Sequence, residues 1–305
     1  MKMEENSVHK FNSLSEVHRA LGLPKPQHPL ISLLNNTECQ IDSNKLPHSH
    51  ILNFYKISYG TTLGGKLKYG QGYYDFDEGS LLFAAPNQLI GKVDDNKVHS
   101  GYTLLISPDF LLSFPLATKI KQYGFFSYGV NEALHLSEQE KATIVSIFKL
   151  IEEELNNRID AFSQEVIISQ IELLLNCSNR FYKRQFITRK AINNDLLQKM
   201  EELLDNYFNS EKSIRNGIPT VQFLAENLNI SPSYLSDMLR NFTGQNAQQH
   251  IHNKLIEKAK IKISTTNQTI SEIAYELGFE HPSSFTKLFK AKTQLSPLEF
   301  RQTFS

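Results

Sequence analysis

The chain has 305 residues, of which 40% are apolar and 21% are charged, and its 32 basic and 32 acidic side chains cancel. Cys39 and Cys177 are too few and too far apart for a disulfide framework, which fits a reducing compartment. Residues 1–13 show no signal peptide, and no run approaches the roughly 18 apolar residues of a membrane helix, so we expect a cytoplasmic protein of about two domains.

Residues 1–47 are punctuated by prolines, and within them residues 15–21 predict a short helix. Residues 50–107 predict β-strands, because aromatic and β-branched runs such as ILNFYKISY and GYTLLIS alternate with glycine-containing turns. Short strands of this kind favour an antiparallel sandwich or barrel. We therefore expect an N-terminal regulatory β-domain over residues 1–135.

Helical periodicity follows in residues 137–157 and 161–181, and Ser137 with Glu140 forms a capping-box pattern at the start. The break at residues 156–157 predicts an antiparallel helical hairpin within a linker spanning residues 136–190. This hairpin either packs on the β-domain or forms a dimer interface. The acid-free basic stretch from Arg180 to Lys190 is either a solvated linker or a surface that faces phosphates.

Residues 193–305 contain an internal repeat, with predicted helix-turn-helix units at 220–243 and 269–293. Ala225 matches Ala274 and Leu228 matches Leu277 at an offset of 49, which becomes 50 after each turn. The two alanines are expected where a pair of helices crosses closely. Gly278 is expected to supply a positive φ in the second turn.

The second helix of each unit has a clear start and two distinct faces. Ser231 and His281 each precede a proline, which is tolerated at the first helical position. The apolar residues turn inward and leave a small, polar and basic outer face that suits the major groove of DNA. The predicted DNA-binding residues are Ser233, Ser236, Asp237, Arg240, Ser283, Ser284, Thr286, Lys287 and Lys290. The alternative is the solvated face of a helical bundle, which two copies with one turn geometry disfavour.

The connector between the units also suits DNA. Residues 246–263 have no glycine or proline and carry four lysines, so they predict a helix of roughly 27 Å. That length places two recognition helices about one turn of DNA apart, roughly 34 Å. From Lys212 to the C-terminus there are 11 basic and 7 acidic side chains, a local excess that favours a nucleic-acid partner although the whole chain is neutral.

Residues 270–301 carry the pattern I-x-E-I-A-x-E-L-G-F-x-x-P-S-x-F-x-x-L-F-K, ending in L-S-P-L-E-F-R. This pattern resembles the signature of the AraC/XylS family of transcription regulators. The resemblance implies a C-terminal DNA-binding domain of about seven helices, an N-terminal cupin-like β-barrel followed by dimerising helices, and action mainly as an activator. The implied fold class is α+β with two domains, the second being an all-α double helix-turn-helix.

Two positions depart from the family pattern. Gln294 stands where the family usually has glycine after the second recognition helix, and a left-handed conformation there would cost roughly 1 kcal/mol relative to glycine. Asp237 stands where the first recognition helix often presents a basic residue. It could accept a hydrogen bond from a cytosine amino group or form a salt bridge with Arg240.

Enzymatic chemistry is not indicated elsewhere. His48 and His50 form an H-x-H pair, but the glutamate and later histidine of a cupin metal site do not follow at the required spacing. We expect these histidines either to line a small-molecule cavity or to be a solvent-exposed pair. Tyr59 and Tyr73 either line the same cavity or belong to the aromatic core. No nucleophile motif or phosphate loop is present, and no catalytic residue, metal or cofactor is predicted.

The sequence therefore predicts a cytoplasmic, sequence-specific transcription regulator rather than a metalloenzyme or a helical protein-interaction module. Its recognition helices, at about residues 232–243 and 282–292, are expected to enter successive major grooves. The expected partners are promoter or operator DNA and RNA polymerase. A small-molecule effector and a second copy of the chain are further candidates, whereas a membrane is not.

Overall fold

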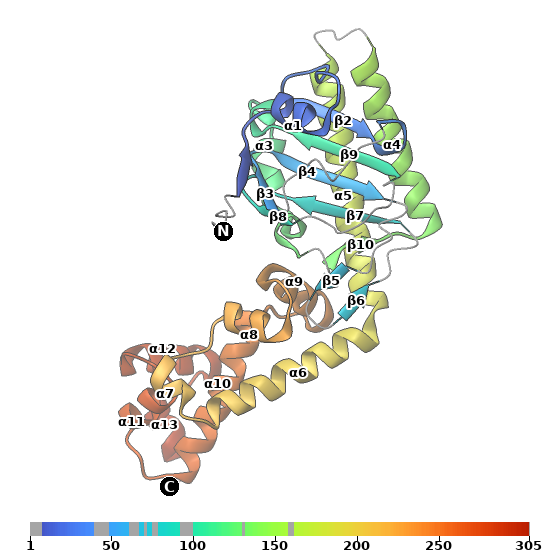
Figure 1. The fold of residues 1–305 in the computed structure, drawn as a ribbon. Helices are drawn as coiled ribbons and strands as arrows, with labels where there is room; N and C mark the ends of the chain where they lie inside the picture. Colours follow the sequence, from blue (N-terminus) through green and yellow to red (C-terminus); the bar gives the residue numbers. More distant parts are fainter. Residues whose placement is uncertain are drawn as a thin grey trace, which may run out of the picture. The chain divides into compact units, whose positions relative to one another are not determined.

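The fold is described from a computed structural model (Figure 1). It describes residues 8–39, 49–60, 67–69, 72–74, 79–91, 100–129, 132–157 and 162–304. The chain divides into two compact units, Met1–Gln185 and Phe186–Ser305. The first combines β-sheets with helices and the second is helical, so the α+β class with a helical C-terminal unit is confirmed.

The N-terminal unit is built on a five-stranded antiparallel sheet in the order β10-β7-β4-β9-β2. A three-stranded sheet, β1-β3-β8, and a two-stranded hairpin, β5-β6, accompany it. The strands are β1 His9–Phe11, β2 Ile31–Asn35, β3 Ser49–Leu52, β4 Tyr55–Gly60, β5 Leu67–Tyr69, β6 Gly72–Tyr74, β7 Ser80–Ala84, β8 Leu89–Gly91, β9 Gly101–Ile106 and β10 Leu134–His135.

The helices of this unit are mostly short until the last two. They are α1 Leu14–Leu21, α2 Asn36–Cys39, α3 Leu116–Lys119, α4 Glu138–Asn156 and α5 Ser163–Thr188, with 3₁₀ turns at Pro108–Leu111, Ile120–Gln122 and Gly124–Ser127. The capping box predicted at Ser137 and Glu140 is present at the start of α4. Helix α5 extends past the end of the first unit into the second.

Helix α4 covers one face of the five-stranded sheet (Figure 1). The ring of Phe148 stacks on Tyr102 of β9, with centroids 5.2 Å apart, and lies 6.4 Å from Tyr59 of β4. On the other face, the buried side chains of Leu34 and Leu105 join the apolar cluster beneath α1 and the three-stranded sheet. Apolar side chains therefore pack against both faces of the five-stranded sheet.

The expected barrel is not confirmed. Within the described ranges the five-stranded sheet ends at β2 and β10, so the sheets do not close. The prediction that the strands are antiparallel is wrong for one pair, because β1 runs parallel to β3 with His9 opposite His50. Parallel neighbours need a long crossover, which here contains α1, β2 and α2.

One side chain of the basic stretch at the end of α5, Arg184, makes contacts within the first unit. Arg184 forms a salt bridge of 2.6 Å with Glu140 of α4 and donates a hydrogen bond of 2.7 Å to the carbonyl of His135. These contacts tie α5 to α4 and β10. The Arg184 side chain thus has a structural role. It fits neither of the two interpretations of the basic stretch, a solvated linker or a surface that faces phosphates.

The C-terminal unit consists of eight helices that follow α5 within the described residues. They are α6 Lys190–Phe208, α7 Lys212–Asn216, α8 Val221–Leu228, α9 Pro232–Thr243, α10 Ala247–Thr265, α11 Ile270–Glu276, α12 Pro282–Thr293 and α13 Pro297–Gln302. Helix α10 lies at the centre of this unit. It buries Ile251, Leu255, Ile256, Ala259 and Ile263.

Ion pairs fix α10 on its polar side. Asp205 of α6 accepts from Lys254 at 2.8 Å and from Lys258 at 2.7 Å, and Glu276 of α11 accepts from Lys262 at 2.7 Å. Hydrogen bonds from the Lys254 and Lys258 ammonium groups hold the pKa of the Asp205 carboxyl below its ordinary value. Three of the four connector lysines thus stabilise the unit.

This arrangement predicts a loss of stability in acid. Because the pKa of Asp205 is lowered in the folded chain, its contribution is complete above the unfolded value of about 3.9 and disappears as the pH falls through the folded value. We expect Asp205→Asn to lower the free energy of unfolding by about 1 kcal/mol at pH 7 and by much less near pH 3. Urea unfolding of both proteins at the two pH values measures this.

The matched control is Asp195→Asn. Asp195 pairs with Lys199 at 2.7 Å within α6, and both side chains are more than half exposed. Because an exposed pair within one helix contributes little, we expect this variant to change stability by less than about 0.5 kcal/mol at either pH. An equal loss in the two variants, or a loss for Asp205→Asn that does not shrink in acid, would contradict the assignment.

Candidate DNA-binding site

In each of the two helix pairs, α8–α9 and α11–α12, a turn of the same geometry joins the two helices. At the end of α8 the Ile230 N–H donates to the carbonyl of Ala225 at 3.0 Å, and after α11 the Phe279 N–H donates to the carbonyl of Ala274 at 3.0 Å. A left-handed residue sits just before each donor, Asn229 in the first turn and Gly278 in the second. These are the bonds of a Schellman turn, so the repeat seen in the sequence is a repeat of backbone geometry.

The change of offset from 49 to 50 has a simple structural cause. One residue, Ser231, separates Ile230 from Pro232, whereas Glu280 and His281 separate Phe279 from Pro282. The extra residue lies between the turn and the following helix. As expected from the sequence, a proline occupies the first turn of both α9 and α12.

Each second helix buries one face in its unit. Helix α9 buries Tyr234, Leu235, Met238 and Leu239, and α12 buries Phe285 and Phe289. The inward direction of Tyr234 was not anticipated, and its ring packs edge-on against Phe186 at 5.3 Å. Ala225 and Ala274 are fully buried, as expected for the crossing points of the helix pairs.

The opposite faces carry the predicted DNA-binding residues, and none of these side chains is buried. Arg240, Ser283, Ser284, Lys287 and Lys290 are exposed, whereas Ser233, Ser236, Asp237 and Thr286 are partly exposed. The Thr286 hydroxyl donates to the carbonyl of Pro282 at 3.0 Å. One exposed cation of α12 was missed, Lys292, whose ammonium donates to Asn253 of α10 at 3.0 Å.

The two outer faces differ in charge. Asp237 and Arg240 form a salt bridge of 2.8 Å across one turn of α9, which is one of the two roles considered for Asp237 from the sequence. The matching positions of α12 hold Lys287 and Lys290, and neither forms a salt bridge within the described residues. The first face is neutral and the second is strongly cationic.

The repeat continues through the ends of both helices. Thr243 and Thr293 each donate to a carbonyl four residues earlier at 2.8 Å, and a left-handed residue follows each threonine. That residue is Gly244, with φ 78°, after α9 and Gln294, with φ 65°, after α12. The left-handed conformation expected for Gln294 is thus present.

Exchanging these two residues tests the left-handed conformation. We expect Gln294→Gly to raise the free energy of unfolding by about 1 kcal/mol, because glycine adopts a positive φ without steric cost. The reciprocal variant, Gly244→Gln, should lower it by a similar amount, since no atom lies within 4 Å to compensate or to clash. Thermal melting of the two variants should therefore shift in opposite directions, and shifts in the same direction would refute the explanation.

Of the ligand-binding residues predicted in the N-terminal unit, the side chains of His50 and Tyr59 are described, and they pack against different elements. His50 is buried in β3 beside Phe11, with ring centroids 5.9 Å apart, and Tyr59 is buried in β4 against Phe148 of α4. His48 and the side chain of Tyr73 lie outside the described residues. Their role in ligand binding stays a prediction.

No group of three or more His, Cys, Asp or Glu side chains within the described ranges could hold a metal ion. No described helix is both long and apolar enough to cross a membrane.

Comparison with known proteins identifies the repeated region. Residues 224–303 match the model of a helix-turn-helix domain family. The chain is 33% identical over 84 residues to YobQ, an HTH-type transcriptional regulator of Bacillus subtilis, an alignment covering 28% of this chain and 35% of that protein. It is also 33% identical over 115 residues to an HTH-type transcriptional regulator of Pseudoalteromonas carrageenovora, which covers 37% of this chain and 63% of that one. The chain thus spans less than two thirds of either relative.

Two solved structures are similar to about a third of the chain. The C-terminal domain of the two-component response regulator yesN from Fusobacterium nucleatum is 35% identical, with 33% of this chain and 96% of that chain aligned and a TM-score of 0.29. The C-terminal domain of AraT, a response regulator from Geobacillus stearothermophilus, is 27% identical, with 35% and 84% aligned and a TM-score of 0.32.

Proposed function

The C-terminal unit of this chain is a helix-turn-helix domain of the AraC type, and from that premise we propose that the protein is a sequence-specific DNA-binding regulator that activates transcription. The observation that carries the proposal is the duplicated turn and helix, with two polar outer faces left uncovered, the second of them basic. Each of α9 and α12 enters a major groove with its outer face toward the base edges.

The proposed contacts fall into two groups. In α9 they are made by Ser233, Ser236, Asp237 and Arg240, and in α12 by Ser283, Ser284, Thr286, Lys287 and Lys290. Hydroxyl groups reach base edges or phosphates at short range, whereas the long cationic side chains reach guanine or the backbone. Support comes from the exposure of these side chains and from the burial of the opposite helix faces.

Helix α10 sets the spacing of the two recognition helices in this proposal. Its 19 residues rise about 28 Å, which is close to the roughly 34 Å of one DNA turn. The salt bridges from Asp205 and Glu276 hold α10 in place. We therefore propose that α9 and α12 bind successive major grooves on one side of the duplex.

The test is selection of binding sequences by the purified full chain from a random pool of duplex DNA. We expect a site with two conserved blocks centred about 10–10.5 base pairs apart, and footprinting that protects both on one side of the duplex. Affinity for this site should fall steeply with salt. Enrichment of no sequence would overturn the proposed function, and protection of a single groove would overturn the paired arrangement.

Activation is tested separately. Transcription by purified RNA polymerase from a promoter that carries the selected site should rise when the protein is added. A fall in transcript would identify a repressor instead.

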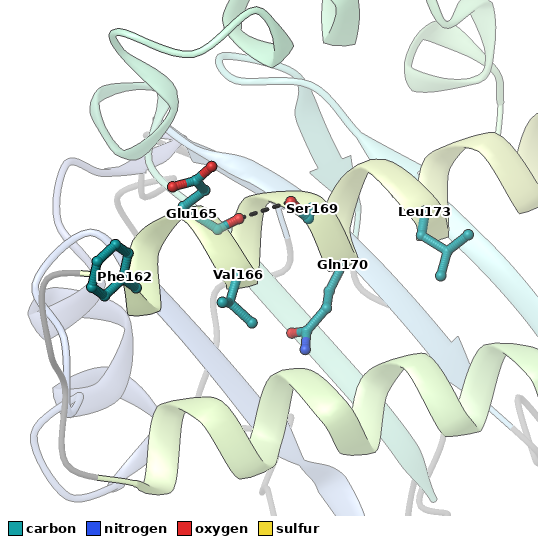
Figure 2. Close-up of a pocket in the computed structure, with 6 residues that line it drawn as sticks. All are labelled: Phe162, Glu165, Val166, Ser169, Gln170 and Leu173. Atoms are coloured by element: carbon teal, nitrogen blue, oxygen red, sulfur yellow. Dashed lines mark hydrogen bonds between the residues drawn. The ribbon is translucent and has the colours of Figure 1, made fainter.

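Dimerisation is the role we propose for the N-terminal unit, through the first turns of α5. A groove of about 490 Å³ there is lined by Phe162, Glu165, Val166, Ser169, Gln170 and Leu173. Figure 2 shows Val166 and Gln170 pointing toward the neighbouring helix α4. Phe162 is 70% and Leu173 49% exposed. Exposed apolar side chains around a groove are of a kind that marks interaction sites.

We propose that a second copy of the chain occupies this groove, because the same surface on two copies can pair about a two-fold axis. We expect Val166→Lys with Leu173→Lys to convert a dimer to a monomer in sedimentation analysis. The matched control is Leu298→Lys, which alters an exposed apolar residue of the other unit. A wild-type chain that stays monomeric at all concentrations would refute dimerisation without affecting DNA binding.

A further inference from the structure

The first recognition helix carries an acid where its copy carries a base. At an offset of 50, Asp237 of α9 corresponds to Lys287 of α12, and Arg240 corresponds to Lys290. The Asp237 carboxylate accepts from the Arg240 guanidinium at 2.8 Å, while the Arg240 side chain stays 57% exposed and that of Asp237 27%. The pair lies on the face that the proposed function turns toward DNA.

The pair presents a definite hydrogen-bond pattern. A guanidinium has five N–H donors, and the bond to Asp237 uses one of them, on Nη1. The remaining donors stand beside a carboxylate, which only accepts. In the major groove a G·C pair offers two acceptors, guanine N7 and O6, followed by the cytosine N4 donor. An arginine next to a carboxylate therefore matches G·C in order, with donors facing acceptors and an acceptor facing the donor.

An A·T pair does not match this pattern. It presents the adenine N7 acceptor, then the N6 donor, then the thymine O4 acceptor. The N6 amino group would face a guanidinium donor and the O4 oxygen would face a carboxylate. Both contacts are repulsive, so the same side chains that favour G·C also reject A·T.

We propose, on the basis of the DNA-binding function proposed above, that the Asp237–Arg240 pair reads one G·C base pair and that α9 provides sequence selectivity while the lysines of α12 provide affinity. Asp237 acts as a positioning residue for Arg240 as well as an acceptor. Its negative charge also disfavours contact with phosphates, so α9 gains little from DNA of the wrong sequence.

The experiment repeats the selection from a random duplex pool with variants of the full chain. We expect Asp237→Ala to bind random DNA more tightly than the wild type but to lose most of the preference, about 10-fold or more, for G·C at one position. Arg240→Lys keeps the positive charge but loses the forked donors of the guanidinium. This variant should therefore lose the same G·C preference while the salt dependence of binding stays unchanged. Thermal melting of each variant should match the wild type, because both side chains lie on the outer face.

Two controls separate base reading from charge. Asp195→Ala makes the same charge change on α6 and should leave the selected sequence intact. Lys290→Ala should weaken binding to all sequences evenly. If the wild type enriches a site and both α9 variants keep its G·C preference, the inference is wrong although the proposed function stands. Loss of the preference in Arg240→Lys alone would remove the role of Asp237, and a wild type that enriches nothing removes the proposed function itself.

Discussion

Replacing Gly278 by alanine is expected to lower the free energy of unfolding of the C-terminal unit by about 3 kcal/mol. Gly278 has φ 91°, where an L-residue costs about 1–2 kcal/mol. An added Cβ would lie 2.5 Å from the carbonyl carbon of Gly217 and 2.8 Å from the amide nitrogen of Ile218. These are backbone atoms that no rotamer change can move, so overpacking of about 1–3 kcal/mol adds to the strain.

The control for this variant is Gly244→Ala. Gly244 also has a positive φ, 78°, but no atom lies within 4 Å of the position of its added Cβ. Gly244→Ala should therefore lower the free energy of unfolding only by the cost of the positive φ, about 1 kcal/mol. Chemical denaturation of the two variants separates strain from close approach. Equal losses at the two positions would show that the contact between Gly278 and Gly217 has no energetic weight.

The second large effect is expected on DNA binding. Lys287→Ala combined with Lys290→Ala should lower affinity for the selected site about 100-fold at 0.1 M salt and reduce the salt slope by about 2. Both lysines are exposed, so the fold should be unaffected. Fluorescence anisotropy over a salt series measures affinity and slope together.

Lys25→Ala with Lys121→Ala is the matched control. These lysines are exposed on the N-terminal unit, and the charge change is the same. We expect this variant to bind like the wild type. If it weakened binding as much as the α12 variant, net charge rather than the face of α12 would govern affinity, and α12 would lose its assigned place in the groove.

Features that depend on neighbouring residues were predictable from the sequence. The capping box at Ser137 and the proline in the first turn of α12 each follow from a few adjacent residues. The left-handed conformation of Gln294 was expected from the family resemblance. The buried and exposed faces of α9 and α12 follow from helical periodicity. For that reason the outer faces could be assigned before any coordinates were known.

Features that depend on distant residues were not predictable. Asp205 pairs with lysines about 50 residues away on α10, and β1 pairs in parallel with β3 across a crossover that contains α1, β2 and α2. Neither contact leaves a pattern in the local sequence. That Asp237 and Arg240 form a salt bridge could not be decided from the sequence either, because a salt bridge at a spacing of three residues depends on side-chain geometry.

The extra residue before α12 also bears on how the two copies can be recombined. The turns that end at Ile230 and Phe279 share one hydrogen-bond pattern, and the difference in length lies at the junction before the prolines. A chimaera that exchanges residues 232–243 for 282–293 would therefore keep both turns intact. Crossovers at that junction should yield folded proteins with transplanted DNA preferences, whereas crossovers inside α8 or α11 would split the buried alanine from the turn it supports.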